Sequence, residues 1–429
     1  MIDKFPFLTP KKILLIEPPF YRFFNYERWY YPLTLTLVGT YLEKLGHDVS
    51  IYDADKPTTN CSSLDRSEIR KNYYKYKDAL ENSMHPIWKE VFEKIEKSKA
   101  DVIGITSITA KIDSANKIAK YAKEYFNDKI RIILGGPHVQ GMSLIYKDYN
   151  FGKYYDEIVQ HIPNLVDQTP NKSLIVDVER YKPEFLSSMI TEAGCPMNCT
   201  FCARSYDRKI IYRNLASIYK ELNQIKNDYG GSVPVSLADD CFLSNTTRFN
   251  EISGYFKELD LKYIGGSRIM ALTQEKIERY ISTGGIRIHV GVESGSQTVL
   301  RRIKKMLNIV EIKKRTKWLN DVKIPWQAFI IVGFPFEVLE DLKKTEDLLY
   351  EIQPTYVSIN RFTPYPGTEI YREFFMNEKI EFKDLFQINS GSCIKLPKEN
   401  EEFINQMYEK FDRYNENNKK KISMGRQGN

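Results

Sequence analysis

The chain has 429 residues, of which 42% are hydrophobic and 28% charged, and its formal net charge is +7. This length and composition predict a globular protein of two or three domains. The modest basic excess favours small anionic ligands and falls short of the basic arm of a nucleic-acid-binding protein. No apolar run reaches the ~20 residues that cross a bilayer, and the N-terminal residues lack the pattern of a signal peptide. We therefore expect a cytoplasmic protein without a membrane span.

Short apolar runs alternate with helical patterns in the first part of the chain. The runs lie at residues 12–19, 48–55, 101–107, 131–137 and 155–160, and amphipathic stretches lie at 35–46, 85–100 and 111–126. Continuous apolar strands separated by helices indicate a parallel sheet covered on both faces. We predict an α/β, doubly wound domain of the flavodoxin-like (Rossmann) type over residues 1–161. Such domains bind ligands beyond the carboxyl ends of their strands.

A polar segment with prolines, residues 162–185, is predicted to be a linker. Apolar runs then return at residues 188–194, 233–240, 261–269, 286–294, 325–334 and 355–362, with helical patterns such as 273–283 and 339–352 between them. This alternation predicts a partial (β/α)6 TIM barrel over residues 186–375, whose sites collect at the carboxyl ends of the strands. Residues 376–429 are predicted to be a short, mostly helical extension.

Three cysteines lie in the segment CPMNCTFC, residues 195–202, where the first barrel strand ends. Their spacing would place the thiols on one face of a helix, so a buried cysteine stripe is one interpretation. A zinc site completed by Cys241 is a second. A third is a cubane iron–sulfur cluster, in which Cys195, Cys199 and Cys202 leave one iron free to bind a small molecule. Clustered cysteines in a reducing compartment favour metal over disulfides.

The motifs that follow the cysteines add a family resemblance. In order they are LADDCF, GVESGSQ, FIIVGFPFE and RFTPYPGTEIY, and together with the cysteine spacing they resemble the radical S-adenosylmethionine (SAM) enzymes. The first half carries PP after its first strand, GHDV, DVIGITSIT and LGGPH. These pieces resemble the radical SAM subgroup with an N-terminal cobalamin-binding domain (class B methyltransferase-like). The resemblance spans about residues 11–375.

The resemblance implies a 4Fe–4S cluster on Cys195, Cys199 and Cys202 that binds SAM and cleaves it to a 5′-deoxyadenosyl radical. The side chains implied to contact SAM are Phe201 at the adenine, Asp239 and Asp240 at the ammonium, Arg268 at the carboxylate and Glu293 at the ribose hydroxyls. For each charged residue, the alternative is an ordinary solvated ion pair at a strand end. Cys241 is expected to be a bystander.

Cobalamin is the second cofactor that the resemblance implies. The residues placed to contact it by their position after the strands are Pro19, Ser107, Thr109, Gly135 and Gly136. The stretch after the first strand, EPPFYRFFNYERWYYP, contains no histidine, so we expect cobalt without a histidine ligand below it. The aromatic run Trp29, Tyr30 and Tyr31 either forms an apolar floor beneath the corrin ring or packs in the core.

The leading hypothesis is a radical SAM enzyme that transfers a methyl group from cobalamin to an unactivated carbon of a small molecule. Its substrate is expected in specialised-metabolite or lipid biosynthesis, and its reductant is expected to be of the flavodoxin or ferredoxin type. One alternative is a cobalamin-free radical SAM enzyme with a vestigial N-terminal domain, which forms rings, rearranges its substrate or transfers another part of SAM. A non-catalytic zinc module and an RNA-modifying enzyme are further alternatives, although no concentrated basic stripe supports RNA binding.

Overall fold

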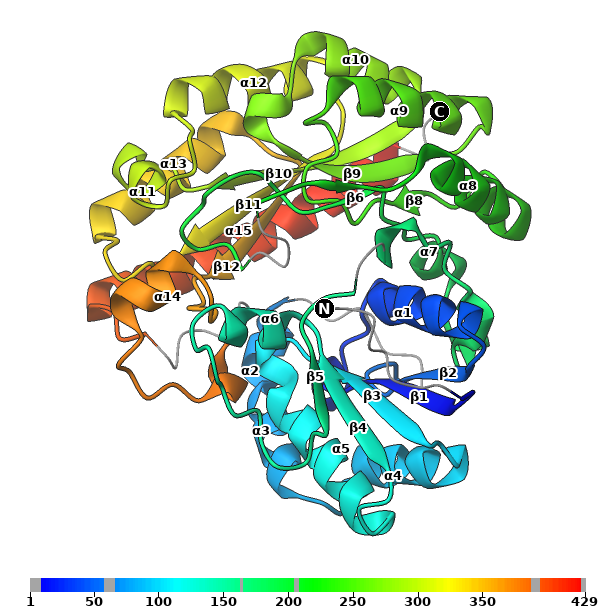
Figure 1. Cartoon of the computed structure of the whole chain (residues 1–429). Coiled ribbons are helices and arrows are strands. Elements are labelled where there is room, and N and C mark those ends of the chain that lie inside the picture. Colours follow the sequence, from blue (N-terminus) through cyan, green and yellow to red (C-terminus); the bar gives the residue numbers. More distant parts are fainter. Residues whose placement is uncertain (1–8, 58–65, 163–164, 204–207, 387–393, 426–429) are drawn as a thin grey trace.

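Five strands rich in isoleucine, leucine and valine form the N-terminal sheet. They are β1 Lys12–Glu17, β2 Asp48–Asp53, β3 Val102–Thr106, β4 Arg131–Gly135 and β5 Glu157–Val159. All pairs are parallel, and the order is β2-β1-β3-β4-β5. The computed structural model describes residues 9–57, 66–162, 165–203, 208–386 and 394–425. This sheet is the lower layer in Figure 1, and its strand order confirms the doubly wound prediction.

Helices cover both faces of this sheet because its strands are apolar on both sides. Along β1, Leu14 and Ile16 face one core, which α4 (Pro86–Ser98) and α5 (Ile112–Tyr125) cover. Ile13 and Leu15 face a second core, which α1 (Leu33–Lys44) covers. Shorter helices, α2 Arg66–Asn72, α3 Tyr74–Glu81 and α6 Pro137–Ser143, complete the layer.

The segment predicted as a linker packs against the N-terminal domain. It consists of three short 3-10 helices, Leu165–Asp167, Lys172–Leu174 and Val178–Arg180, followed by α7 Pro183–Leu186. Ile175 forms an isolated parallel bridge with Ile51 of β2, and both side chains are buried. The linker therefore extends the edge of the first sheet before the chain enters the second layer.

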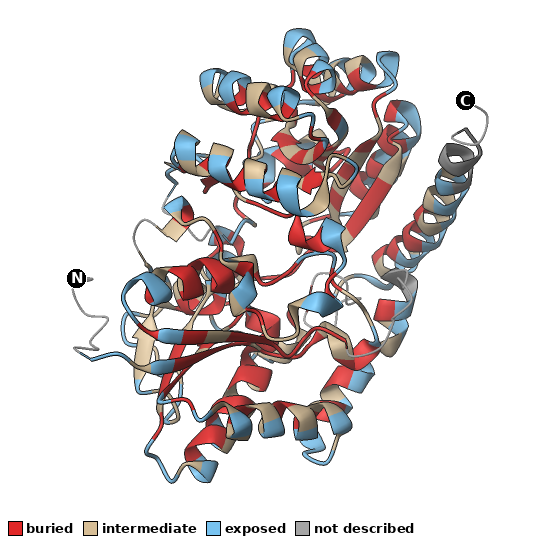
Figure 2. Ribbon diagram, turned by 90° about the vertical axis from the view of Figure 1, so that its right-hand side faces the viewer, coloured by how far each residue is buried: buried red, intermediate tan, exposed pale blue. Residues whose placement is uncertain are grey.

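The second layer is an open barrel of parallel strands under a row of helices (Figure 1). Its strands are β8 Val235–Ser236, β9 Tyr263–Arg268, β10 Gly285–Glu293, β11 Trp326–Val332 and β12 Tyr356–Arg361, in the order β12-β11-β10-β9-β8. The outer helices are α8 Leu215–Tyr229, α9 Thr246–Glu258, α10 Gln274–Ser282, α11 Gln297–Arg302, α12 Ile309–Asp321 and α13 Leu339–Ile352. Figure 2 shows the buried faces of these helices turned toward the sheet.

The first predicted barrel strand, residues 188–194, is much reduced. Met189 makes one parallel bridge to Leu237, beyond β8. The chain then forms β6 Glu192–Ala193, which pairs antiparallel with β7 Ile211–Tyr212. The result is the predicted partial barrel, whose first strand contributes a bridge in place of a full ladder.

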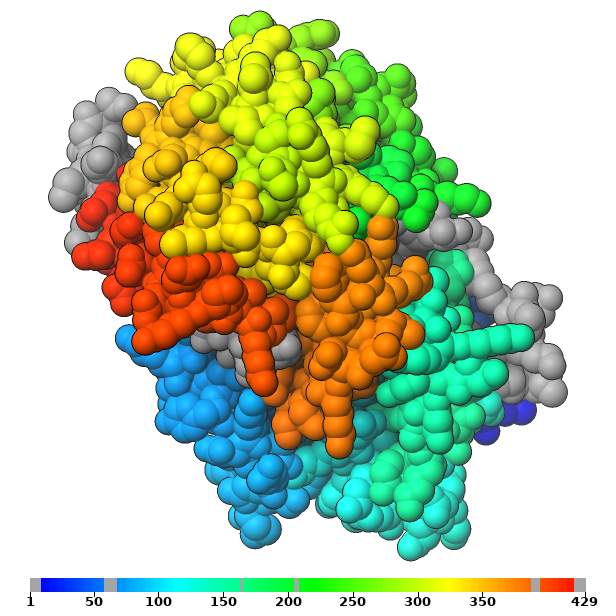
Figure 3. All heavy atoms as spheres, turned by 90° about the vertical axis from the view of Figure 1, so that its left-hand side faces the viewer, coloured from blue at the N-terminus to red at the C-terminus, as the bar shows by residue number. Residues whose placement is uncertain are grey.

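The C-terminal extension joins the two layers. It follows α14 Glu369–Phe374 and contains the long helix α15 Lys398–Gly425. The side-chain amide of Asn415 in α15 bonds both backbone groups of Val357, at 2.8 Å each, so α15 covers the edge strand β12. Phe386 stacks on Tyr73 in the N-terminal core, with ring centroids 5.6 Å apart. Figure 3 shows the segment from α14 onward bridging the barrel and the N-terminal domain.

Across the described ranges, none of the helices combines the length and the apolarity that a membrane span requires.

Candidate active site

The three clustered cysteines lie in the loop of residues 194–203, which we call the cysteine loop. Its backbone is held from both sides: Thr200 N–H donates to the Ile303 carbonyl at 3.0 Å, and the Thr200 carbonyl accepts from Ile370 N–H at 3.1 Å. Cys195 and Cys199 are half-buried, Cys202 is exposed, and none of the three is part of a disulfide among the described residues. The loop therefore presents its thiols at the carboxyl ends of the barrel strands, as the sequence predicted.

The thiols lie beside two cations and a fourth cysteine. A hydrogen bond with the buried Cys241 thiol lowers the pKa of Cys195, and the same bond raises the pKa of Cys241. Burial raises the pKa of Cys199, while the ammonium of Lys305 opposes that effect. Iron binds thiolates, so the nearby cations, Lys305 and Arg268, favour the form that a cluster requires.

The donor set suits a cubane cluster. In the described part of the chain no three His, Cys, Asp or Glu side chains converge on a single metal ion. The thiolates of a cubane cluster bind different irons and need no common point. A loop with three thiols, one of them exposed, meets that requirement.

Glu293 and Lys305 form a buried ion pair next to the cysteine loop. The carboxylate Oε1 and the ammonium lie 2.5 Å apart, and the two side chains are only 9% and 13% exposed. Glu293 ends β10 in the left-handed region, with φ of 70°, directly after a β-bulge. A Cβ on Gly291 would lie 2.5 Å from that Oε1, so a side chain here would displace the ends of the paired side chains. Lys305 Nζ also lies 6.0 Å from the centroid of the Phe201 ring.

The two predicted aspartates serve the scaffold of the loop. Asp239 is buried and accepts from the backbone N–H of Thr191 at 2.6 Å and of Glu192 at 3.2 Å, as well as from the Thr191 hydroxyl. Burial raises the pKa of Asp239 to about 6, and the hydrogen bonds from Thr191 partly offset this. Asp240 accepts from Gly194 N–H at 2.9 Å. Their predicted contact with the SAM ammonium therefore stays a prediction.

Arg268 ends β9 and is half-buried. Among the residues that the structure describes, no carboxylate pairs with its guanidinium, so it is available to an anionic ligand. Phe201 is half-buried, with its ring centroid 6.1 Å from that of Phe334. The structure thus brings the three cysteines, Phe201, Arg268 and Glu293 to one end of the barrel. Lys305 belongs with them, and sequence reasoning missed it.

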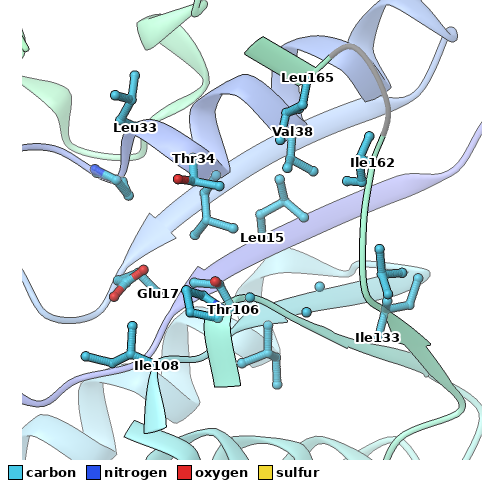
Figure 4. A pocket seen from close by; sticks show the side chains of 18 of the residues that line it. Leu15, Glu17, Leu33, Thr34, Val38, Thr106, Ile108, Ile133, Ile162 and Leu165 are labelled. Carbon is cyan, nitrogen blue, oxygen red and sulfur yellow. The ribbon is translucent and has the colours of Figure 1, made fainter. Parts of the chain in front are cut away.

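A cavity of about 520 Å³ opens at the carboxyl edge of the N-terminal sheet. Its walls are one face of β1, β3 and β4 together with α1, and Figure 4 shows 18 of the residues that line it, with labels on ten. Gly135 and Gly136 line it, and their contact with cobalamin stays a prediction. Two barrel residues, Ile190 and Ala238, also line it, and they stand just before Thr191 and Asp239 in the chain. The cavity therefore opens toward the cysteine loop.

Three residues predicted for this site are absent from the cavity lining. The Ser107 hydroxyl is buried and donates to the Ile108 carbonyl at 2.8 Å. Thr109 Oγ1 lies 3.3 Å from Nδ1 of the buried His138. The Pro19 carbonyl accepts from the Ser114 hydroxyl at 2.9 Å. Their polar groups are satisfied within the protein, which leaves Thr34 and Thr106 as the hydroxyl groups of the cavity lining outside tyrosine.

An ionic cluster closes the polar end of the cavity. Glu17, Arg28 and Lys111 line it; Arg28 pairs with Asp53 at 2.6 Å, and Lys111 pairs with Asp55 at 2.8 Å. Burial alone would lower the pKa of Lys111, but Asp55 and Glu17 raise it, so the ammonium stays charged. Glu17 and Arg28 of this cluster come from the stretch that contains no histidine, and sequence reasoning did not find the cluster.

The aromatic run beside this cluster divides into different environments. Tyr30 and Tyr31 line the cavity, with Tyr31 fully buried and Tyr30 47% exposed. Trp29 is 57% exposed and is absent from the lining. Part of the run therefore packs in the core and part faces the cavity, and neither predicted role covers all three residues.

Comparison with known families agrees with both halves of this description. Residues 189–349 match the model of the Radical SAM superfamily, and residues 24–147 match that of the B12 binding domain. The fold and the cysteine loop thus define a two-domain protein that joins a B12 binding domain to a radical SAM domain. Each match covers less than half of the chain, so the resemblance to known families is carried by the two domains separately.

Individual relatives share this arrangement at low identity. The uncharacterized methyltransferase PH0819 of Pyrococcus horikoshii is 25% identical over 67% of this chain and 72% of its own. The anaerobic magnesium-protoporphyrin IX monomethyl ester cyclase of Rubrivivax gelatinosus is 24% identical over 75% of this chain and 66% of its own. The structure of the radical SAM methyltransferase TsrM of Kitasatospora setae, with cobalamin and a 4Fe-4S cluster bound, has a TM-score of 0.58 at 13% identity, over 85% of this chain and 78% of that one. This last likeness establishes the fold.

Proposed function

We propose that this protein is a cobalamin-dependent radical SAM methyltransferase that acts on an unactivated carbon of a small molecule. One observation carries the proposal: the cavity of the B12 binding domain is lined in part by Ile190 and Ala238 of the barrel. These residues adjoin the strand ends that anchor the cysteine loop. A group held in the cavity and a group held at the cysteines would therefore face the same space between the domains.

The residues of the barrel would bind and orient SAM. Cys195, Cys199 and Cys202 would hold the cluster, and Arg268 has no carboxylate partner among the described residues, which suits it to the SAM carboxylate. Glu293 would meet the ribose hydroxyls in the orientation that Lys305 fixes at 2.5 Å. When bound, the cluster supplies the electron that cleaves SAM, and cobalamin supplies the methyl group.

The residues of the N-terminal domain would hold cobalamin and exclude water. Gly135 and Gly136 add no side chain at the carboxyl edge of the cavity, and the ionic cluster of Glu17, Arg28 and Lys111 closes the adjoining end. The cavity lining does contain a histidine, His161, which is exposed and follows β5. It does not belong to the loop after β1, so cobalt without a histidine ligand from that loop remains our expectation.

The partners of the reaction follow from this chemistry. An external one-electron donor of the flavodoxin or ferredoxin type would reduce the cluster, through the exposed side of Cys202. We place the small-molecule substrate in specialised-metabolite or lipid biosynthesis, and the protein in the cytoplasm.

The proposal is tested with anaerobically purified protein, SAM bearing a deuterated methyl group, a chemical reductant, and cobalamin either present or omitted. We expect 5′-deoxyadenosine in both samples and a corrinoid spectrum on protein purified after incubation with cobalamin. Label in the corrinoid fraction supports methyl transfer. Formation of 5′-deoxyadenosine without any corrinoid binding would refute the cobalamin-dependent reaction and favour ring formation or rearrangement.

A further inference from the structure

The two faces of the barrel sheet have different surroundings. On β10, Ile288 and Val290 are buried in the core under the outer helices, so the alternating residues Arg287 and His289 lie on the opposite, concave face. Figure 1 shows α9, α10 and α12 on the side of the sheet away from the N-terminal domain. The concave face therefore lies on the side of the space between the domains.

The concave face is open beside His289. The strand register places Gly266 of β9 next to His289. Among the described residues, a Cβ on Gly266 would have only one atom within 4 Å, the carbonyl oxygen of Asp239 at 3.5 Å. Just beyond β8, at the edge of the same sheet, Ala238 is exposed and lines the cavity of the N-terminal domain. This face is therefore accessible from the space between the domains.

Three neighbouring polar side chains on this face have no partner within the described parts of the protein. Gln327 of β11 lies opposite His289, and Arg287 precedes His289 on the same face. None of the three makes a side-chain hydrogen bond or an ion pair there. Arg287 Nε and His289 Nε2 are also shielded from solvent. Buried polar groups are nearly always hydrogen-bonded, so this group of side chains has the character of a binding site without its ligand.

The charge of Arg287 lacks a counter-ion in the same part of the structure. Burial lowers the pKa of Arg287, and the groups that oppose this effect are the phenols of Tyr356 and Tyr280. Burial and the nearby Arg287 lower the pKa of His289 to about 4, so the imidazole is neutral at pH 7. A neutral imidazole still donates one hydrogen bond. The three side chains thus offer one cation and two neutral hydrogen-bonding groups.

We propose that Arg287, His289 and Gln327 bind an anionic oxygen group of the substrate, either a carboxylate or a phosphate. The inference rests on the proposed function, because it takes the ligand to be the molecule that receives the methyl group. A guanidinium binds carboxylate and phosphate through two parallel hydrogen bonds. The imidazole and the amide add further donors, and the anion supplies the counter-charge that Arg287 lacks.

The site lies deeper in the barrel than the predicted SAM contacts. Arg268 of β9 pairs with Gly291 of β10, which is two residues beyond His289 and four beyond Arg287. At about 3.3 Å per residue these separations are about 7 and about 13 Å along the strand. Phe329, opposite Gly291 on β11, has its ring centroid 5.7 Å from that of His289. A substrate anchored by its anionic group at Arg287 therefore extends past an aromatic wall toward the cysteine loop.

The test uses three small probes whose dissociation constants fluorine NMR measures on the anaerobically purified protein. They are para-fluorobenzoate, para-fluorophenyl phosphate and the uncharged para-fluorobenzamide. At least one anion should bind at least about tenfold more tightly than the amide, because hydrogen bonds between charged groups are stronger than neutral ones. The anion that binds more tightly identifies the substrate group as carboxylate or phosphate.

Two variants locate the binding. Arg287→Gln should weaken both anions to about the affinity of the amide. Its melting temperature should be no lower than that of the parent protein, because the arginine has no partner to lose among the described residues. Gly266→Leu keeps every charge and fills the space beside His289, so it should weaken the tighter anion at least about tenfold. A lower melting temperature for Arg287→Gln would assign the arginine to the scaffold and overturn the inference.

Two other arginines provide controls. Arg301 of α11 is exposed and, like Arg287, has no ion pair in the described ranges. Arg268 is the side chain predicted to meet the SAM carboxylate. Arg301→Gln and Arg268→Gln should both keep the preference for an anion over the amide.

Two results would overturn the inference: equal affinity for the anions and the amide, or a preference that survives Arg287→Gln. Both leave the proposed function intact, because SAM cleavage and corrinoid binding are measured without these probes. Anion binding that depends on Arg287 in a protein that binds no corrinoid would contradict the cobalamin-dependent reaction and support the anionic class of substrate.

Discussion

Replacing Lys305 by methionine tests whether the Glu293–Lys305 pair supports the SAM end of the barrel. Methionine keeps most of the length of the side chain and removes its charge. Lys305 is the only cation paired with Glu293 in the described ranges, and the two side chains are 13% and 9% exposed. The variant therefore leaves a carboxylate in a nearly dry site without its counter-ion.

The size of the effect follows from that burial. Removing one partner of a buried ion pair costs about 3 to 5 kcal/mol, because the remaining charge has lost its compensation. A loss of about 3 kcal/mol lowers the melting temperature of a domain of roughly 150 to 250 residues by about 6 to 12 °C. Differential scanning calorimetry of the cluster-free protein measures this shift directly.

Lys304→Met provides the matched control one residue away. Lys304 pairs with Glu369 at 2.6 Å, but these side chains are 49% and 44% exposed. An exposed pair contributes at most about 1 kcal/mol, which corresponds to no more than roughly 2 to 4 °C. Adding Glu293→Gln to Lys305→Met should recover part of the stability, since the unpaired charge is then removed. Equal shifts for the two single lysine variants would refute this reasoning.

Three further changes have defined outcomes. Gly291→Ala places a methyl group 2.5 Å from the Glu293 carboxylate and 2.9 Å from the Lys305 ammonium, so the ends of both side chains must shift. SAM affinity by equilibrium dialysis should then fall by roughly threefold to tenfold; unchanged affinity would separate the pair from SAM binding. Cys241→Ala should keep the full iron content on reconstitution, and loss of iron would make Cys241 a ligand. Burial lowers the pKa of His138 to about 4 from its ordinary 6.5, so the unfolded chain binds more protons between these values. The contribution of neutral His138 to the free energy of unfolding is then fully present above the unfolded pKa, and it falls by about 2 kcal/mol near pH 5. His138→Gln should therefore reduce the change in melting temperature between about pH 7.5 and about pH 5. An unchanged pH dependence of the melting temperature would assign that dependence to other groups.

The layers of the fold were predictable from the sequence because the strands are apolar on both faces. Val102–Thr106 and Trp326–Val332 each read as a buried strand between helical patterns, and both are central in their sheets. The first barrel strand was predicted to be longer than it is. The backbone N–H groups of Thr191 and Glu192 donate to the Asp239 carboxylate, so a side chain takes the hydrogen bonds that a neighbouring strand would have supplied.

The site was predictable where a motif fixes the chemistry, as at the three cysteines, and less so where packing decides. Lys305 stands in a basic run that resembles a solvated helix end, and only the fold places its ammonium against Glu293. Ser107 and Thr109 occupy the expected loop, yet their hydroxyls meet partners within the protein. The direction in which a loop hydroxyl points depends on tertiary contacts that no spacing rule encodes.

The most direct test of the account is the cofactor content of the anaerobically purified protein and of its Cys199→Ala variant, with iron, sulfide and corrinoid measured in the same samples. We predict about four irons and four sulfides per chain, as a cubane cluster requires, together with bound corrinoid in the parent protein. The variant should lose the cluster and SAM cleavage but keep corrinoid, because the cavity lies in the other domain. A parent protein without iron, or a Cys199→Ala variant that still cleaves SAM, would contradict the account.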